Sequence, residues 1–247
     1  MASGYAHRPT SAAALTRAER AGAPVAAGAW ALDVGGGPGT HAAQWIRAGL
    51  NGLVLDPSGE MCRRALGVSG VPAVRGRSQA LPFVAGAFDL VYFHLSIHYG
   101  DWRAALDEAS RVLSPRGSIE IWTLGRRHHE RSNLARWFPS VSSIDADRFP
   151  EPTEIVSHLG SRGFEVERTE ETETVDRRVG EWVAAVRGGF VSTLQLVSPT
   201  ELETGLEAFV HLHPDPDASF RYELRYDRVG ARRPPLLLPE ESGDPME

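Results

Sequence analysis

The stretch Ala31–Trp45, ALDVGGGPGTHAAQW, decides the fold of this chain. It passes from a short apolar run, through a turn with four glycines and one proline, into a pattern typical of a helix. Glycine removes the side chain from the surface of such a turn, so a ligand can approach the backbone closely. The stretch therefore predicts a strand, a ligand-binding turn and a helix in succession.

Short apolar strands and amphipathic helices alternate on both sides of this unit. Strands are expected at 30–34, 52–56, 71–76, 88–95 and 118–124, and helices at 11–20, 41–48, 58–66 and 101–113. This alternation predicts a parallel sheet covered by helices on both faces. Because crossovers are right-handed, the carboxyl ends of the strands share one edge, where ligands bind in such folds.

The order of elements changes after Leu124. A helix is expected at 152–162, a strand at 163–173, and a last, antiparallel strand at 219–229. Two helical insertions, 125–150 and 178–212, are expected to form a lid over the ligand edge. We therefore expect an α/β fold with a Rossmann-like, doubly wound, seven-stranded sheet. It would form one domain over residues 1–229, followed by a disordered tail over 230–247.

Composition narrows the class of protein. The chain has 247 residues, 42% of them hydrophobic, and a net charge of −6, so it lacks the basic footprint of a nucleic-acid binder. Its one cysteine, Cys62, excludes an internal disulfide and a Cys-x-x-Cys metal site, and no metal is expected. No apolar run reaches the roughly 18 residues of a membrane span. We expect a cytoplasmic enzyme or binding protein, monomeric or homodimeric.

Two ligand classes use a glycine-rich turn of this kind. Gly37, Gly39 and Ala42 satisfy the G-x-G-x-x-G/A spacing of dinucleotide-binding proteins. Asp33, however, lies just before the first glycine, where a carboxylate would face a cation better than a pyrophosphate. Asp56 ends the next strand and could bond both hydroxyls of a ribose in either class. Asp33 therefore favours a ligand that carries a positive charge.

Four segments of the chain resemble the class I S-adenosylmethionine-dependent methyltransferases. They are ALDVGGGPG, LVLDPSGEM, VRGRSQALPFVAGAFDLVYF and ALDEASRVLSPRGSIEIW, and they run in the family's order over residues 31–123. Within the family, the group of small-molecule methyltransferases that includes the quinone C-methyltransferases is the most similar. The resemblance implies S-adenosylmethionine as cofactor and methyl transfer to O, N or C of a small organic acceptor.

The resemblance also implies cofactor-binding residues. Asp33 would hold the ammonium group of the cofactor, Asp56 its ribose hydroxyls, and Met61 the adenine face. Arg77 matches a family position that accepts the adenine amino proton, which an arginine cannot do. Asp56 could also simply cap the next turn, and Met61 could be a core residue. The whole expected set is Asp33, Gly35, Gly36, Gly37, Gly39, Asp56, Pro57, Met61, Arg77, Ser78, Phe93 and His94.

Methyl transfer is an in-line displacement that needs alignment of donor and acceptor and exclusion of water, and a general base is optional. His98 and His94, after the fourth strand, are the candidate catalytic residues. A histidine pKa near neutrality would suit deprotonation of a phenol or enol. His98 could instead only shape the pocket. His128 and His129, beside several arginines, could meet an acidic acceptor or form a solvated loop.

Other functions stay open at this point. An NAD(P)-dependent oxidoreductase is less favoured, because the chain has no lysine and no Tyr-x-x-x-Lys pair. A protein that binds S-adenosylmethionine without transferring its methyl group is compatible with the sequence, since the transfer needs no fixed side chain. Aromatic residues of the lid would either line a site for a flat or apolar acceptor or anchor the lid helices; they are Trp137, Phe138, Trp182, Phe190 and Phe209.

Overall fold

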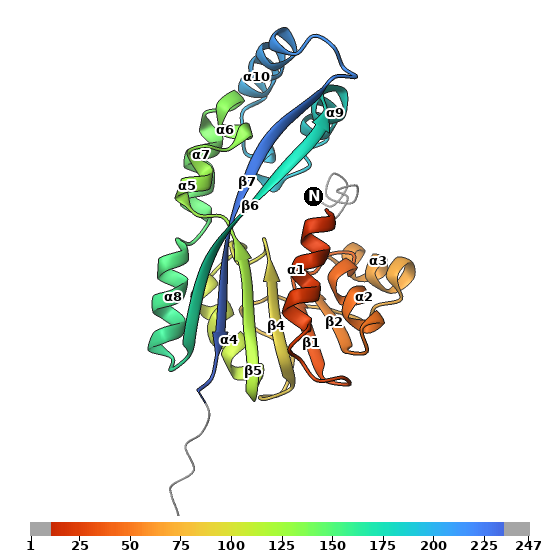
Figure 1. Cartoon of the computed structure of the whole chain (residues 1–247), viewed down its shortest axis with the longest axis vertical. Helices are drawn as coiled ribbons and strands as arrows, with labels where there is room; N and C mark the ends of the chain where they lie inside the picture. The colour runs from red at the N-terminus through yellow and green to blue at the C-terminus, as the bar shows by residue number, and fades with distance from the viewer. Residues whose placement is uncertain (1–10, 235–247) are drawn as a thin grey trace, which may run out of the picture.

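The computed structural model describes residues 11–234, and in this part of the chain seven strands form one sheet in the order β3-β2-β1-β4-β5-β7-β6 (Figure 1). The strands are β1 Trp30–Val34, β2 Asn51–Asp56, β3 Ala73–Arg75, β4 Phe88–His94, β5 Leu113–Thr123, β6 Glu165–Arg178 and β7 Ser219–Arg232. Strands β1 to β5 are parallel, and β7 runs antiparallel to both β5 and β6. The expected doubly wound sheet with an antiparallel last strand is therefore confirmed.

Helices cover both faces of this sheet (Figure 1). The helices that pack on the two faces are α1 Ala12–Gly22, α2 Thr40–Arg47, α3 Gly59–Ser69, α4 Trp102–Val112 and α8 Pro152–Ser161. The insertions contain α5 Arg126–His129, α6 Asn133–Trp137, α7 Ser140–Arg148, α9 Val179–Arg187 and α10 Pro199–Leu212, with a 3-10 helix, η2, at Ser192–Gln195. Several begin at a side chain that accepts a backbone N–H, as Ser11 does for α1 and Asp101 for α4. None of these helices is long and apolar enough to span a membrane.

Alternate residues of the central strands pack on opposite faces of the sheet. In β4, Leu90 and Tyr92 lie in a cluster with α1, α2 and α3, whereas Val91 and Phe93 lie in a cluster with α4 and α8. This alternation follows from the two-residue period of a strand. Because both faces are covered, polar groups of the central strands can reach a ligand only at the strand ends.

Strands β6 and β7 continue beyond the rest of the sheet (Figure 1). They pair over their whole lengths, but β5 pairs with β7 only up to Asp227. Residues 171–178 and 219–226 therefore form a two-stranded ribbon without another neighbouring strand. The two lid insertions pack together on this ribbon. Strand β6 is longer than expected because it pairs with β7 as far as Arg178, and every second residue of its ribbon part is half-buried: Glu171, Glu173, Val175 and Arg177.

The lid has a hydrophobic core of its own. Phe138, Trp182 and Phe209 are fully buried in it, and the ring centres of Trp182 and Phe209 are 4.0 Å apart. Their burial favours the expected role of anchoring the lid helices over lining an acceptor site. Trp137 and Phe190 are half-buried at the border of the same core.

Two boundaries differ from the sequence-based expectation. The SPRG segment does not separate helix from strand, because α4 passes directly into β5 at Leu113 and the register with β4 shifts there. The expected disorder from residue 230 is wrong for 230–232. Gly230 and Ala231 pair with β5 on one side and β6 on the other. Residues 235–247, the rest of the expected tail, lie outside the described residues, as do 1–10.

Candidate functional site

The glycine turn connects β1 to α2 at the carboxyl edge of the sheet. Gly35, Gly37 and Gly39 have φ of 73°, 54° and 80°, in the region that favours glycine. A Cβ at Gly36 would lie 2.5 Å from Cγ of Asp33, whereas a Cβ at Gly37 would meet nothing within 4 Å. The turn is therefore closed toward Asp33 and open at Gly37, where a ligand can reach the backbone.

Asp56 connects the end of β2 to this turn. Its Oδ2 accepts the Gly37 N–H at 3.0 Å, and its Oδ1 accepts the Ser58 N–H at 2.8 Å. Burial raises the pKa of Asp56, and the two N–H bonds partly offset that effect. Each oxygen has a second lone pair, so both expected roles are compatible: Asp56 caps the next turn and can still accept ribose hydroxyls.

Asp33 is almost fully buried below the turn. Its Oδ2 lies 3.3 Å from Nδ1 of His41, a residue of α2 that the sequence analysis did not single out. The ring of His41 is 4.9 Å from that of His94 at the end of β4. Asp33 therefore has the ring of His41 as a neighbour within the chain, and that ring lies beside His94.

The other expected cofactor residues differ in accessibility. Pro57 and Arg77 are exposed and Ser78 is half-buried, and Arg77 lies in the turn that follows β3. Met61 on α3 is buried. Phe93 is fully buried in the core cluster under α4 and α8, a position that favours packing over ligand contact.

His98 lies in the loop after β4, between two rings. Its ring centre is 4.1 Å from that of Tyr99 and 3.9 Å from that of Phe149, and the residue is 7% exposed. Burial, with the positive charges of Arg148 and His129, lowers the pKa of His98 to about 3. The expectation of a pKa near neutrality is therefore wrong for this arrangement. His98 is neutral at pH 7, and it is a weak base.

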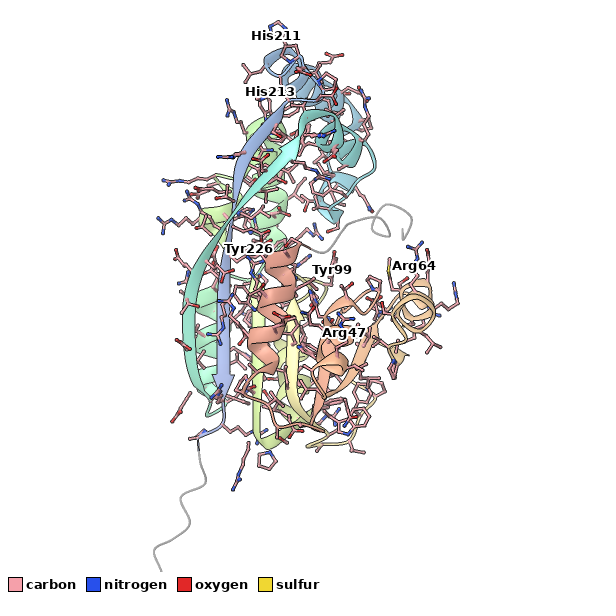
Figure 2. The ribbon with its side chains drawn as sticks, turned by 45° about the vertical axis from the view of Figure 1, so that its right-hand side comes forward. Arg47, Arg64, Tyr99, His211, His213 and Tyr226 are labelled. Atoms are coloured by element: carbon pink, nitrogen blue, oxygen red, sulfur yellow. The ribbon has the colours of Figure 1, made fainter. Side chains whose placement is uncertain are left out.

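The lid brings further polar residues to this loop. The Tyr99 hydroxyl donates to Oγ of Ser192 in η2 at 3.1 Å, and Figure 2 shows Tyr99 and Tyr226 at the upper end of α1, where the ribbon begins. His128 and His129 are buried, so the expectation of a solvated loop is wrong for both. Nδ1 of His128 accepts the backbone N–H of Arg225 in β7 at 3.1 Å. A local sequence pattern could not show this partner.

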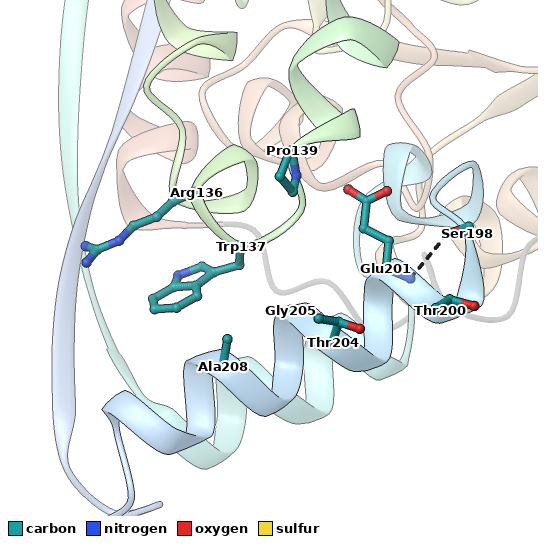
Figure 3. Close-up of a pocket in the computed structure, with 9 residues that line it drawn as sticks. All are labelled: Arg136, Trp137, Pro139, Ser198, Thr200, Glu201, Thr204, Gly205 and Ala208. Carbon is teal, nitrogen blue, oxygen red and sulfur yellow. Dashed lines mark hydrogen bonds between the residues drawn. The ribbon is translucent and has the colours of Figure 1, made fainter.

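A separate cavity of about 530 Å³ lies between α6 and α10 on the lid (Figure 3). Trp137, Glu201 and Gly205 are among its lining residues, and none of the expected catalytic or cofactor-binding residues lines it. Among residues 11–234, no three His, Cys, Asp or Glu side chains are placed to hold a metal ion together. The candidate site is the carboxyl edge of the sheet at the glycine turn, next to the loop after β4 and η2.

Comparisons with known proteins show which proteins this chain resembles. Residues 32–121 match the methyltransferase domain family. A malonyl-[acyl-carrier protein] O-methyltransferase of Erwinia billingiae is 35% identical over 132 residues, which cover 52% of this chain and 51% of that protein. The chain therefore spans about half the length of the curated relatives it matches.

Solved structures share the fold. A protein described as a methyltransferase of an antibiotic biosynthesis pathway, from Anabaena variabilis, matches with a TM-score of 0.69 at 21% identity, over 84% of this chain and 92% of that one. The YcgJ protein of Bacillus subtilis matches with a TM-score of 0.62 at 16% identity, over 89% and 99%. At these identities the likeness shows the fold alone. Together with the match over residues 32–121 to the methyltransferase domain, it shows that this chain has the Rossmann-like α/β fold of methyltransferases.

Proposed function

We propose that the chain transfers the methyl group of S-adenosylmethionine to a small organic acceptor at the carboxyl edge of the sheet, beside the glycine turn. The observation that carries the proposal is the turn itself, which is open at Gly37 and fixed there by the carboxylate of Asp56. The match at 32–121 ends before the lid begins, so it supports the binding of the cofactor. In this proposal the residues that bind the acceptor include those of the lid.

The residues of the turn fit the chemistry of this cofactor. When bound, S-adenosylmethionine supplies a methyl group that its sulfonium already activates. Asp56 would accept ribose hydroxyls with its remaining lone pairs, and the bare backbone at Gly37 would contact the amino-acid end. The buried carboxylate of Asp33, beside the ring of His41, would accept the ammonium group. The same carboxylate would repel a pyrophosphate.

The loop after β4 and the lid would align the acceptor and exclude water. The hydrogen bond between Tyr99 and Ser192 joins the loop after β4 to η2 beside the proposed site. With a pKa of about 3, His98 would bind and orient an acceptor rather than remove its proton. Catalysis in this proposal therefore rests on holding the cofactor and the acceptor close together and on excluding water from the site.

Calorimetry and thermal unfolding with three ligands test the cofactor assignment. S-adenosylmethionine and S-adenosylhomocysteine are expected to bind and to raise the melting temperature of the chain, and NADH is expected to do neither. Binding of NADH alone would overturn the proposal.

A second experiment tests the transfer. The chain is incubated with methyl-labelled S-adenosylmethionine and fractionated small-molecule extracts, and labelled products are identified by mass. A product with one added methyl group is the expected result. Tight cofactor binding without any labelled product would favour a protein that binds the cofactor and does not transfer its methyl group.

A further inference from the structure

Arg148, at the end of α7, extends toward η2 and the loop after β4. Its Nη1 donates to Oγ1 of Thr193 at 3.1 Å, and its Nη2 donates to Oγ of Ser192 at 2.9 Å. Both acceptors are neutral hydroxyls. The carboxylate of Asp145 is 3.8 Å from Nη1 and already accepts the Thr193 hydroxyl at 2.6 Å. Since a guanidinium has five N–H groups, Arg148 keeps donors for a ligand.

His98 lies beside this guanidinium and lacks hydrogen-bond partners. Within the part of the chain that the structure describes, neither of its ring nitrogens has a partner, although both are buried. Buried polar groups of native proteins are nearly always hydrogen-bonded, by protein, water or ligand. The two nitrogens therefore indicate that His98 faces a molecule other than the chain itself.

Hydrogen bonds and ring contacts join Arg148 and His98 into one cluster. Oγ of Ser192 contacts both Arg148 and the hydroxyl of Tyr99, and the guanidinium carbon is 5.9 Å from the centre of the Tyr99 ring. Tyr99 in turn packs on His98. The positive charge of Arg148 opposes protonation of the His98 imidazole. The cluster thus presents one fixed positive charge and one neutral imidazole.

The cluster also lies against the glycine turn. Oγ of Ser96 donates to the carbonyl oxygen of Val34 at 2.5 Å, and a Cβ at Gly35 would lie 2.6 Å from Cβ of Ser96. Leu95, at the start of this loop, has φ of 53°, a strained value for a residue with a branched side chain. The loop that carries His98 and Tyr99 is therefore held directly on the proposed cofactor site.

We propose that the acceptor carries a carboxylate, which the unused N–H donors of Arg148 bind while the neutral imidazole of His98 donates a hydrogen bond to the acceptor. The proposal rests on the function proposed above. A guanidinium binds a carboxylate through two parallel hydrogen bonds, which are stronger than bonds between neutral groups. The same positive charge would repel an ammonium-bearing acceptor, and a neutral acceptor would leave Arg148 without a counter-ion at hydrogen-bond distance.

Binding of small carboxylates to the full chain loaded with S-adenosylhomocysteine tests this proposal. The probes are benzoate and malonate, and benzamide and malonamide are their neutral counterparts. The wild-type chain is expected to bind each carboxylate at least about tenfold more tightly than its amide. R148Q is expected to lose this preference. R136Q is the matched control, because Arg136 is a lid arginine beside the separate cavity, and it should keep the preference.

Further variants separate charge from lid structure. S192A removes one contact that holds Arg148 and keeps its charge, so it should retain most of the carboxylate preference. H98F keeps a ring between Tyr99 and Phe149 and removes the imidazole hydrogen bond, so it should bind the carboxylates more weakly without loss of S-adenosylhomocysteine binding.

The two proposals fail in different ways. Equal affinity of the wild-type chain for carboxylates and amides, or an unchanged preference in R148Q, would overturn the carboxylate assignment. A wild-type chain that fails to bind S-adenosylhomocysteine in the same samples would instead overturn the proposed function.

Discussion

The carboxylate of Asp56 accepts the backbone N–H of Gly37 at 3.0 Å, across 19 positions of sequence. The bond joins the ends of two neighbouring parallel strands at the edge where the cofactor is proposed to bind. It sets the shape of the glycine turn and aims a carboxylate at the same opening. Both partners of this bond can be changed singly, each with a matched control elsewhere in the chain.

G37A should reduce cofactor binding more than stability. Gly37 and Gly70 both have positive φ, and a Cβ at either would meet no atom within 4 Å. Each Gly→Ala change should therefore lower the free energy of unfolding by a similar amount, about 1–2 kcal/mol. Only the methyl group at residue 37 would occupy the proposed cofactor opening. Calorimetry with S-adenosylhomocysteine should show a loss for G37A alone, and equal affinity of G37A and G70A would contradict the assignment.

D56N should weaken binding of S-adenosylmethionine by roughly tenfold or more, because it replaces a charged acceptor of two N–H bonds by an amide. The control is D89N. Asp89 accepts the Trp30 N–H at 3.1 Å and the Ser114 hydroxyl at 2.9 Å, but it lies at the beginning of β4, toward the opposite edge of the sheet. Both variants should lose stability, and only D56N should lose affinity. If calorimetry gave D56N and D89N the same affinity for S-adenosylmethionine, Asp56 would only cap the turn after β2.

Stability should fall as the pH drops below about 6.5, partly because of His98. Its pKa is about 3 in the folded chain and 6.5 when unperturbed, so between these values the unfolded chain binds a proton that the folded chain excludes. The stabilisation is fully present at pH values above the unfolded-state pKa of His98, and it is lost as the pH falls toward the folded-state pKa. Near pH 5 the loss from this one group is roughly 2 kcal/mol. Burial also lowers the pKa of His128, to about 4, in the same direction.

H98F tests this share of the pH dependence. The variant removes the titrating group and keeps an aromatic ring in its place. Urea unfolding of both proteins at several values between pH 7 and pH 4.5 should show a shallower loss for the variant. Parallel curves would mean that His98 does not titrate as its burial indicates.

Arg17 and Arg20 of α1 offer a second matched pair. Arg17 is fully buried, 3.8 Å above the ring of Tyr226, with Nε 2.9 Å from Glu171 and Nη2 2.9 Å from Glu173. R17A would leave the Glu173 carboxylate without this partner and should lower the free energy of unfolding by about 3–5 kcal/mol. The Arg20 side chain also pairs with Glu171 but is 55% exposed, so R20A should cost about 1 kcal/mol or less. Similar losses in urea unfolding would contradict a special role of Arg17 in holding α1 on the ribbon.

The local pattern of the sequence predicted the central sheet. Strand and helix periods, the glycine turn and the acids at 33 and 56 are properties of neighbouring residues, so they can be read without knowledge of distant partners. The same locality explains the errors at the ends of elements. The SPRG segment has the composition of a turn, yet it lies within β5, because Leu113 and Ser118 on either side of it pair with β4. Gly230 and Ala231 look like the start of a tail, yet two strands hold them.

Only the tertiary structure decided the chemistry around the proposed acceptor. The segment RRHHE is polar in composition, but its two histidines are buried, and His128 bonds to a residue 97 positions away. Likewise, nothing near His98 in sequence predicts the low pKa that Arg148 and burial give it. Arg148 itself became a candidate only because η2, more than 40 positions further along the chain, presents two neutral hydroxyls to it. Burial and charge at a site depend on chain segments brought together from far apart, and a single sequence window contains neither.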